Sequence, residues 1–126
     1  MQVNEWIIVK LSRAIATAEG FYARIEGSYR NRPQRNMNPG DLKIDTIGQA
    51  IGKDKDGFVI YPSIEVGFAA ARQQVRLMFD GSKIYNPDMT ILEVAQHYTT
   101  TDQDTWATIV AQELNVSQDT KLKELI

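Results

Sequence analysis

Residues 63–79, with the sequence SIEVGFAAARQQVRLMF, contain the most regular apolar pattern in the chain. The apolar residues recur at spacings of three or four, at Ile64, Phe68, Ala71, Val75 and Met78. This period places them on one face of a helix. Small and large apolar neighbours widen the face, which predicts a helix at the centre of the core. Gly67, within the helix, is expected to let a neighbouring helix approach closely.

A second amphipathic helix is predicted at the start of the chain, over residues 5–19. Its apolar face carries Ile8, Leu11 and Ile15. Asn4 is suited to cap the N-terminus of this helix, and Gly20 is suited to end it in a left-handed conformation.

Glu19 lies at the end of this helix, at the edge of its apolar stripe. At about 100° per residue it falls roughly 20° from Ile8 around the helix axis. A carboxylate against an apolar face is poorly solvated when ionised, so we expect its pKa to rise. Such a glutamic acid can donate a proton near neutral pH. The alternative is an ordinary solvated glutamate, which the helix dipole slightly disfavours at this end.

Residues 22–56 contain prolines, glycines and asparagines and show no helical period. We expect a long ordered loop there with room for a short hairpin, followed by a strand over residues 57–61. Loops of this length inside a domain are usually functional or disordered, and the apolar residues of this one favour order.

Two shorter helices are predicted in the last third of the chain. Thr90 and Glu93 have the spacing of a capping box for the first of them. The second is expected to open at Thr101 and to bury Trp106, and Ser117 is a candidate cap for a final turn. The sequence therefore predicts a single, mainly α domain over residues 1–126, with a small irregular or β insertion after the first helix.

Composition excludes several classes of function. The 126 residues include no cysteine and one histidine, so thiolate chemistry and a histidine-rich metal cluster are excluded. A net charge of −2 argues against a nucleic-acid partner. No apolar run approaches the roughly 18 residues of a membrane span, so membrane insertion is not expected. The start of the chain lacks the features of a secretory signal, so we expect synthesis in the cytoplasm without a signal peptide.

Residues 35–42, with the sequence RNMNPGDL, resemble the R-N-x-N-P-G-(N/D)-(L/I) segment of phage and prophage lysozyme-like proteins. These proteins are related to lytic transglycosylases and goose-type lysozymes. Residues 18–22, 58–67 and 96–99 are similar to flanking segments of the same family, in the same order. The chain departs from the family pattern at Met37 and Asp41, where the family usually or often has asparagine.

The resemblance implies a lysozyme-like fold and cleavage of the β-1,4 glycosidic bonds of bacterial peptidoglycan. Glu19 would be the general acid that protonates the oxygen between N-acetylmuramic acid and N-acetylglucosamine. Attack by water would give hydrolysis, and attack by the 6-hydroxyl of the muramic acid would give an anhydro product. The partner would be the glycan strands, with no metal or organic cofactor. The protein would act at the cell wall, delivered by a virion or a lysis system.

Five further residues are candidates for sugar binding, namely Tyr22, Asn36, Asn38, Tyr61 and Tyr98. Tyrosines offer an apolar face and a polar tip to a sugar ring, but core packing is an equal alternative for each. The two asparagines are also typical of an ordinary turn.

A glycosidase that uses two carboxylates needs a partner for Glu19. Asp41, Asp45 and Glu65 are the candidates, and because no spacing favours any of them, we expect a mechanism with one carboxylate. Glu65 is equally explained as a first-turn acid at a helix N-terminus.

The main rival hypothesis is a catalytically silent structural or binding module of a virion or a secretion apparatus. The acidic pI of about 5.4 favours it, because many lysozymes are basic to suit an anionic wall. An arginine-rich stretch, formed by Arg24, Arg30, Arg32 and Arg35, is either a solvated face or a surface that attracts carboxylates of peptidoglycan stem peptides. An adaptor function through this stretch has little support in the sequence.

Overall fold

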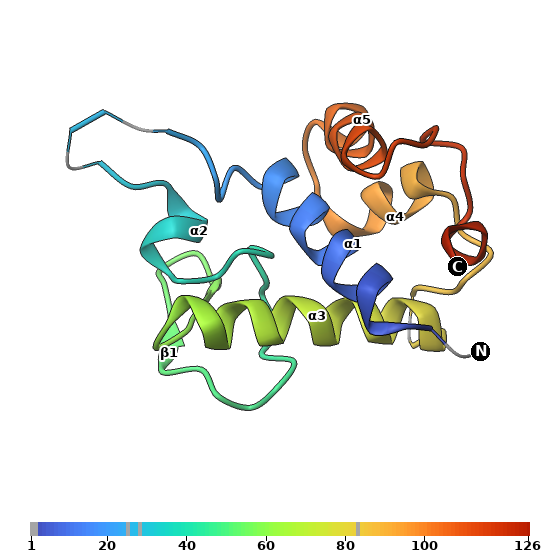
Figure 1. The fold of residues 1–126 in the computed structure, drawn as a ribbon. Helices are drawn as coiled ribbons and strands as arrows, with labels where there is room; N and C mark the ends of the chain where they lie inside the picture. The colour runs from blue at the N-terminus through green and yellow to red at the C-terminus, as the bar shows by residue number, and fades with distance from the viewer. Residues whose placement is uncertain (1–2, 25, 28, 83) are drawn as a thin grey trace.

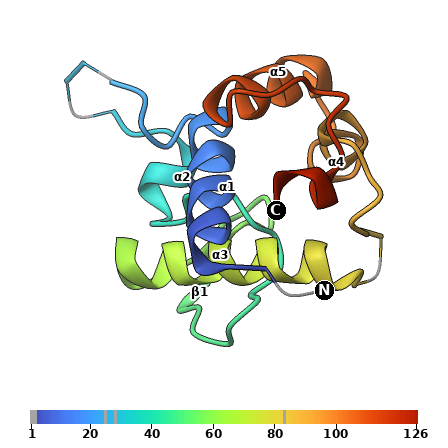
Figure 2. The same ribbon diagram turned by 45° about the vertical axis from the view of Figure 1, so that its right-hand side comes forward.

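A long helix, α3 (Ile64–Asp80), runs across the whole molecule, and α1 (Glu5–Ala18) crosses it (Figures 1 and 2). The computed structural model describes residues 3–24, 26–27, 29–82 and 84–126. Its other elements are α2 (Arg32–Arg35), β1 (Gly52–Lys53), β2 (Val59–Ile60), α4 (Ile91–Tyr98), α5 (Gln103–Glu113) and a 3-10 helix, η1 (Leu122–Leu125). The predicted mainly helical domain with a small β insertion is confirmed. None of the helices in these ranges is long and apolar enough to cross a membrane.

The first helix divides the molecule into two parts in both views. In both views α2 lies on one side and α4 and α5 lie on the other, and Figure 1 shows β1, which pairs with β2 in antiparallel fashion, on the side of α2. The segment between α1 and α2 extends away from the body of the protein in both figures.

Capping residues fix the N-terminal ends of the two long helices, and those of α1 are the ones that the sequence predicts. The side chain of Asn4 accepts a hydrogen bond from the N–H of Ile7 at 3.0 Å, and Ser63 caps α3 in the same way. Gly20 follows α1 with a φ of 84°. A left-handed residue of this kind lets the chain turn away from the helix.

The last third of the chain agrees with the sequence in part. The capping box of Thr90 and Glu93 is present at the start of α4. The next helix begins two residues later than predicted, because Asp102 adopts a left-handed conformation and becomes its N-cap. Ser117 closes a turn by accepting a hydrogen bond from Asp119, and the last helical turn forms further on, in η1.

Two buried clusters form the core. The larger contains apolar residues of α1, α3, α4 and α5 together with Leu114 and Leu122. The smaller contains Leu42, Val59, Tyr61 and Ala70. Tyr98 packs against both clusters, so it joins the two parts of the molecule. Ile64, which the helical pattern places on the core face, is 44% exposed at the first turn of α3.

Gly67 was predicted to let a neighbouring helix approach closely, but the segment that approaches it is not a helix. A Cβ atom at this position would lie 1.9 Å from the carbonyl oxygen of Met37 and 2.8 Å from Pro39. The close neighbour is therefore the backbone of the loop after α2. The glycine holds that loop against α3, because no side chain fits between them.

Replacing Gly67 with alanine tests this contact. Inside an ordinary helix, Gly→Ala stabilises a protein by about 1 kcal/mol. Here we expect Gly67→Ala to lower the free energy of unfolding by about 1–3 kcal/mol, because the loop must move away from α3. Urea denaturation measures the difference. An unchanged or increased stability would show that the loop does not depend on this glycine.

Candidate active site

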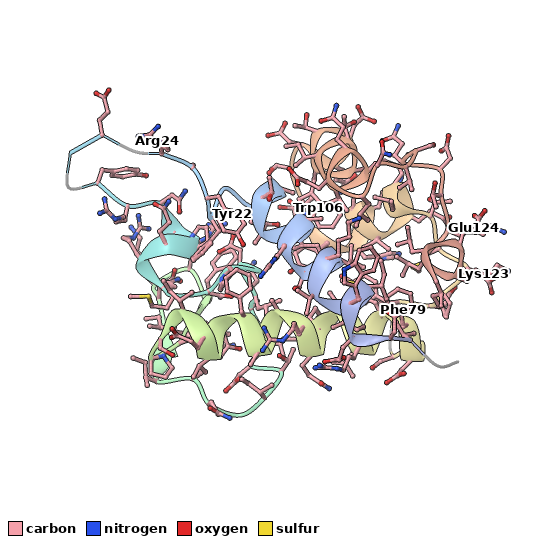
Figure 3. All side chains as sticks on the ribbon, viewed as in Figure 1. Tyr22, Arg24, Phe79, Trp106, Lys123 and Glu124 are labelled. Atoms are coloured by element: carbon pink, nitrogen blue, oxygen red, sulfur yellow. The ribbon has the colours of Figure 1, made fainter. Side chains whose placement is uncertain are left out.

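Glu19 is the C-cap of α1, and its backbone N–H donates a hydrogen bond to the carbonyl of Ile15 at 2.9 Å. Its side chain accepts a hydrogen bond from the indole N–H of Trp106, with Nε1 2.8 Å from Oε2. Trp106 comes from α5 and is 5% exposed. Figure 3 shows it close to the C-terminal end of α1, where Tyr22 also lies. A neutral donor thus fixes one oxygen of the carboxyl group.

Burial raises the pKa of Glu19 from its ordinary value of 4.5 to about 7. The Trp106 hydrogen bond and the positive charge of Arg32 oppose this rise, and the negative charge of Asp41 adds to it. The carboxyl group makes no ion pair within the described ranges of the chain. Near neutral pH it therefore exists in both protonated and ionised forms, as its place in the helix pattern led us to expect.

Arg32 is engaged by Asp41 and not by Glu19. Its Nε lies 3.0 Å from Oδ1 and its Nη2 lies 2.6 Å from Oδ2 of the aspartate, in a fork geometry. The side chain of Asp41 is 4% exposed, and that of Arg32 is 39% exposed. Two parallel charge-assisted hydrogen bonds compensate the burial of the aspartate. The Asp41 carboxylate is therefore not accessible to attack a sugar.

Tyr98 links this loop to the two helices on the other side of α1. Its hydroxyl donates a hydrogen bond to the carbonyl of Gly40 at 2.6 Å, and its ring lies 5.0 Å from that of Trp106. Burial raises the pKa of Tyr98 well above its ordinary value. The ring expected to stack on a sugar is used instead to join the partner of Glu19 to the loop that carries Asp41.

Asn38 does not fit the expected contact with substrate. It is 0% exposed, and its amide donates hydrogen bonds to the carbonyls of Leu42 and Val59 and accepts one from the N–H of Leu42. A buried amide with all these partners in the backbone holds the shape of the loop. The turn-forming alternative that its sequence context allows describes it better.

Asn36 has a similar structural task. It is 5% exposed, and its side-chain amide donates a hydrogen bond to Asp54 at 2.9 Å. Its backbone carbonyl accepts a hydrogen bond from the N–H of Tyr61 at 2.8 Å. These bonds tie the loop to the hairpin. A direct contact with a sugar is therefore not supported for Asn36 either.

The remaining two tyrosines differ from each other. Tyr61 is 1% exposed and donates from its hydroxyl to Asp45 at 3.2 Å, so it belongs to the smaller core cluster. Tyr22 is 50% exposed and stacks beside Phe68, with 6.4 Å between ring centroids. Among the five sugar-binding candidates, Tyr22 alone presents a large open face.

The other carboxylates considered as partners of Glu19 have structural tasks. Asp45 accepts hydrogen bonds from the backbone N–H groups of Ile47, Gly48 and Ala50. Burial raises the pKa of Asp45, but hydrogen bonds from the backbone and from Tyr61 outweigh it, so the pKa is lowered. Glu65 lies exposed in the first turn of α3, where the sequence also explains it as a helix-terminal acid. No group of three histidine, cysteine or carboxylate side chains that could hold a metal ion forms in the parts of the chain that the structure describes.

Sequence reasoning missed the roles of Arg32 and Trp106. Trp106 was predicted only as a member of an apolar stripe. A buried indole N–H needs an acceptor, however, and so indicates a polar neighbour. The aspartate at position 41, where related segments often carry asparagine, could have signalled a nearby counter-charge.

The chain matches no protein-family model, no curated protein and no solved structure.

The shifted pKa of Glu19 predicts a pH-dependent effect on stability. Because the folded state holds this proton more tightly than the unfolded state, Glu19 costs nothing below about pH 4.5. Its ionisation costs roughly 3 kcal/mol once the pH exceeds about 7. We therefore expect Glu19→Gln to raise the free energy of unfolding by roughly 2–3 kcal/mol at pH 8 and by little at pH 4.

Urea denaturation at both pH values measures this difference. Glu124→Gln makes the same chemical change in η1, far from Tyr22 and Trp106 in Figure 3, and is the control. The same gain for Glu19→Gln at both pH values would contradict a raised pKa at Glu19.

Proposed function

We propose that this protein cleaves the β-1,4 glycosidic bonds of bacterial peptidoglycan, as a lysozyme or a lytic transglycosylase, with Glu19 as the general acid. The observation that carries the proposal is a partly buried carboxyl group with a pKa of about 7 and no counter-ion among the described residues. A general acid is most effective when its pKa lies near the working pH. The resemblance of residues 35–42 to lysozyme-like proteins supplies the reaction class.

The hydrogen bond from Trp106 assigns the two oxygens of Glu19 different tasks. Since Oε2 accepts the indole N–H, the proton of the acid form belongs on Oε1. In the proposed first step, Oε1 donates this proton to the glycosidic oxygen, and the bond from that oxygen to the anomeric carbon breaks. The carboxylate left behind keeps the Trp106 hydrogen bond and the attraction of Arg32, both of which favour its ionised form.

In the second step this carboxylate accepts a proton from the attacking hydroxyl. The hydroxyl belongs either to water or to the muramic acid itself, so the product is hydrolysed or anhydro. Asp41 is buried against Arg32, and Asp45 is held by backbone N–H groups. Their engagement supports a mechanism in which one carboxylate serves both steps, without a metal or an organic cofactor.

The proposed place of action is the bacterial cell wall, reached from a virion or through a lysis system. A catalytically silent module of a virion or secretion apparatus is the second candidate. It is favoured by the burial of Asn38 and Tyr61, which leaves fewer side chains for a sugar than the sequence led us to expect.

Digestion of purified, insoluble peptidoglycan separates the two candidates. We expect the wild-type protein to release soluble fragments, and Glu19→Gln to be about 100-fold to 10,000-fold slower, because a general acid contributes about this much to the rate. Glu124→Gln should keep the wild-type rate, because Glu124 lies far from Trp106 and Tyr22 (Figure 3). Mass analysis of the fragments then distinguishes anhydro ends from hydrolysed ends.

The pH profile adds a second criterion. Because only protonated Glu19 can donate, the rate should fall as the pH rises through about 7. No release by the wild-type protein across this pH range, or equal release by Glu19→Gln, would overturn the catalytic assignment.

A further inference from the structure

Two cations lie against the ring of Phe58, just before β2. The Cζ atom of Arg32 is 3.5 Å from the ring centroid, and the Nζ atom of Lys43 is 4.9 Å from it. Lys43 is exposed, and the side chain of Arg32 is 39% exposed. Contact with an aromatic ring holds a cation in place while part of it stays open to solvent.

Arg32 keeps hydrogen-bond donors for a ligand. A guanidinium group has five N–H donors, and Asp41 uses those of Nε and one of Nη2. Its Nη1 donates to no residue in the described ranges of the chain. Since Asp41 and Phe58 already fix this side chain, it loses little freedom when it binds an anion.

Lys43 is the cation of the pair whose charge is not compensated by a salt bridge among the described residues. The charge of Arg32 is compensated by Asp41, and Asp54 and Glu19 are also near enough to act on it. The charge of Lys43 therefore remains available to an anion. An anion is attracted by Lys43 and oriented by the open edge of Arg32.

We propose that Arg32 and Lys43 form a binding site for a carboxylate of the peptidoglycan stem peptides. The proposal rests on the proposed function, which supplies the anionic substrate. The site is close to the reacting bond, because the charges of Arg32 and Glu19 are near enough to influence each other. A bound stem peptide would thus help to place the glycan strand beside the general acid.

Co-sedimentation with insoluble peptidoglycan tests the site without requiring catalysis. All proteins carry Glu19→Gln, so that the polymer is not digested during the measurement. We expect Lys43→Gln to weaken binding about fivefold at low salt, and this difference to disappear at high salt. Lys10→Gln is the matched control, because Lys10 also lies over an aromatic ring, 4.6 Å from the centroid of Trp6, but on the first half of α1.

One double variant tests the contribution of Arg32. Removing Arg32 alone would leave Asp41 buried without its counter-charge, so Arg32→Gln is combined with Asp41→Asn. This double variant should also bind less tightly, although its net charge is unchanged. The circular dichroism spectrum checks that it is folded, and Lys43→Gln carries the test if it is not.

Changes to the peptidoglycan itself provide two further tests of the site. The parent protein is the one that carries Glu19→Gln alone. When the carboxylates of the peptidoglycan are amidated with a carbodiimide, the parent protein and the Lys43→Gln variant should bind this polymer equally weakly. Soluble glycan strands freed of stem peptides keep the lactyl carboxylate, and as competitors they should displace the parent and Lys43→Gln equally.

Three results would overturn the site: equal losses in Lys43→Gln and Lys10→Gln, no effect of amidation, or unequal displacement by the stripped strands. If the protein with Glu19 intact still digests peptidoglycan in any of these cases, the site fails and the proposed function stands. Binding that depends on Lys43, without digestion by the wild-type protein, would reject the catalytic function and keep the site. No binding by the parent protein would overturn the site, and digestion by the wild type then decides the function separately.

Discussion

The contact between the Met37 carbonyl and Gly67 is the constraint on which the rest of the structure depends. A single added methyl group would overlap the carbonyl, so the loop after α2 can lie on α3 only because position 67 has no side chain. Once the loop lies there, the buried amide of Asn38 ties it to Leu42 and Val59. The loop then turns at Asp41, which adopts a φ of 49°, and brings that aspartate near the end of α1.

The chemistry of Glu19 follows from how the neighbouring charges are paired. Arg32 forms its fork with Asp41, so Glu19 accepts a hydrogen bond from the neutral N–H of Trp106 and forms no salt bridge with a cation among the described residues. Had Arg32 paired with Glu19, the pKa of the glutamate would be lowered and the acid form would be lost at neutral pH. The buried ion pair with Asp41 thus keeps Arg32 from forming a direct ion pair with the general acid, although its charge still acts on Glu19.

The sequence predicted the parts of the fold that depend on local patterns, including α3, α1 with its caps and the capping box of α4. It also predicted the position of Glu19 at the edge of an apolar face. It did not predict which element fills the space at Gly67, nor the fork between Arg32 and Asp41, because these contacts join segments that only the folded chain brings together. For the same reason the sequence left Asn38 and Tyr61 open between ligand contact and a structural role, and the structure buries both.

The central claim is that burial keeps Glu19 protonated near neutral pH. The most direct measurement is a titration of the Glu19 side-chain carboxyl carbon by NMR, assigned by comparison with Glu19→Gln. We predict a midpoint near pH 7, well above the ordinary value of 4.5. A midpoint at or below that ordinary value would contradict the claim, and Glu19 would then be a solvated or charge-paired carboxylate.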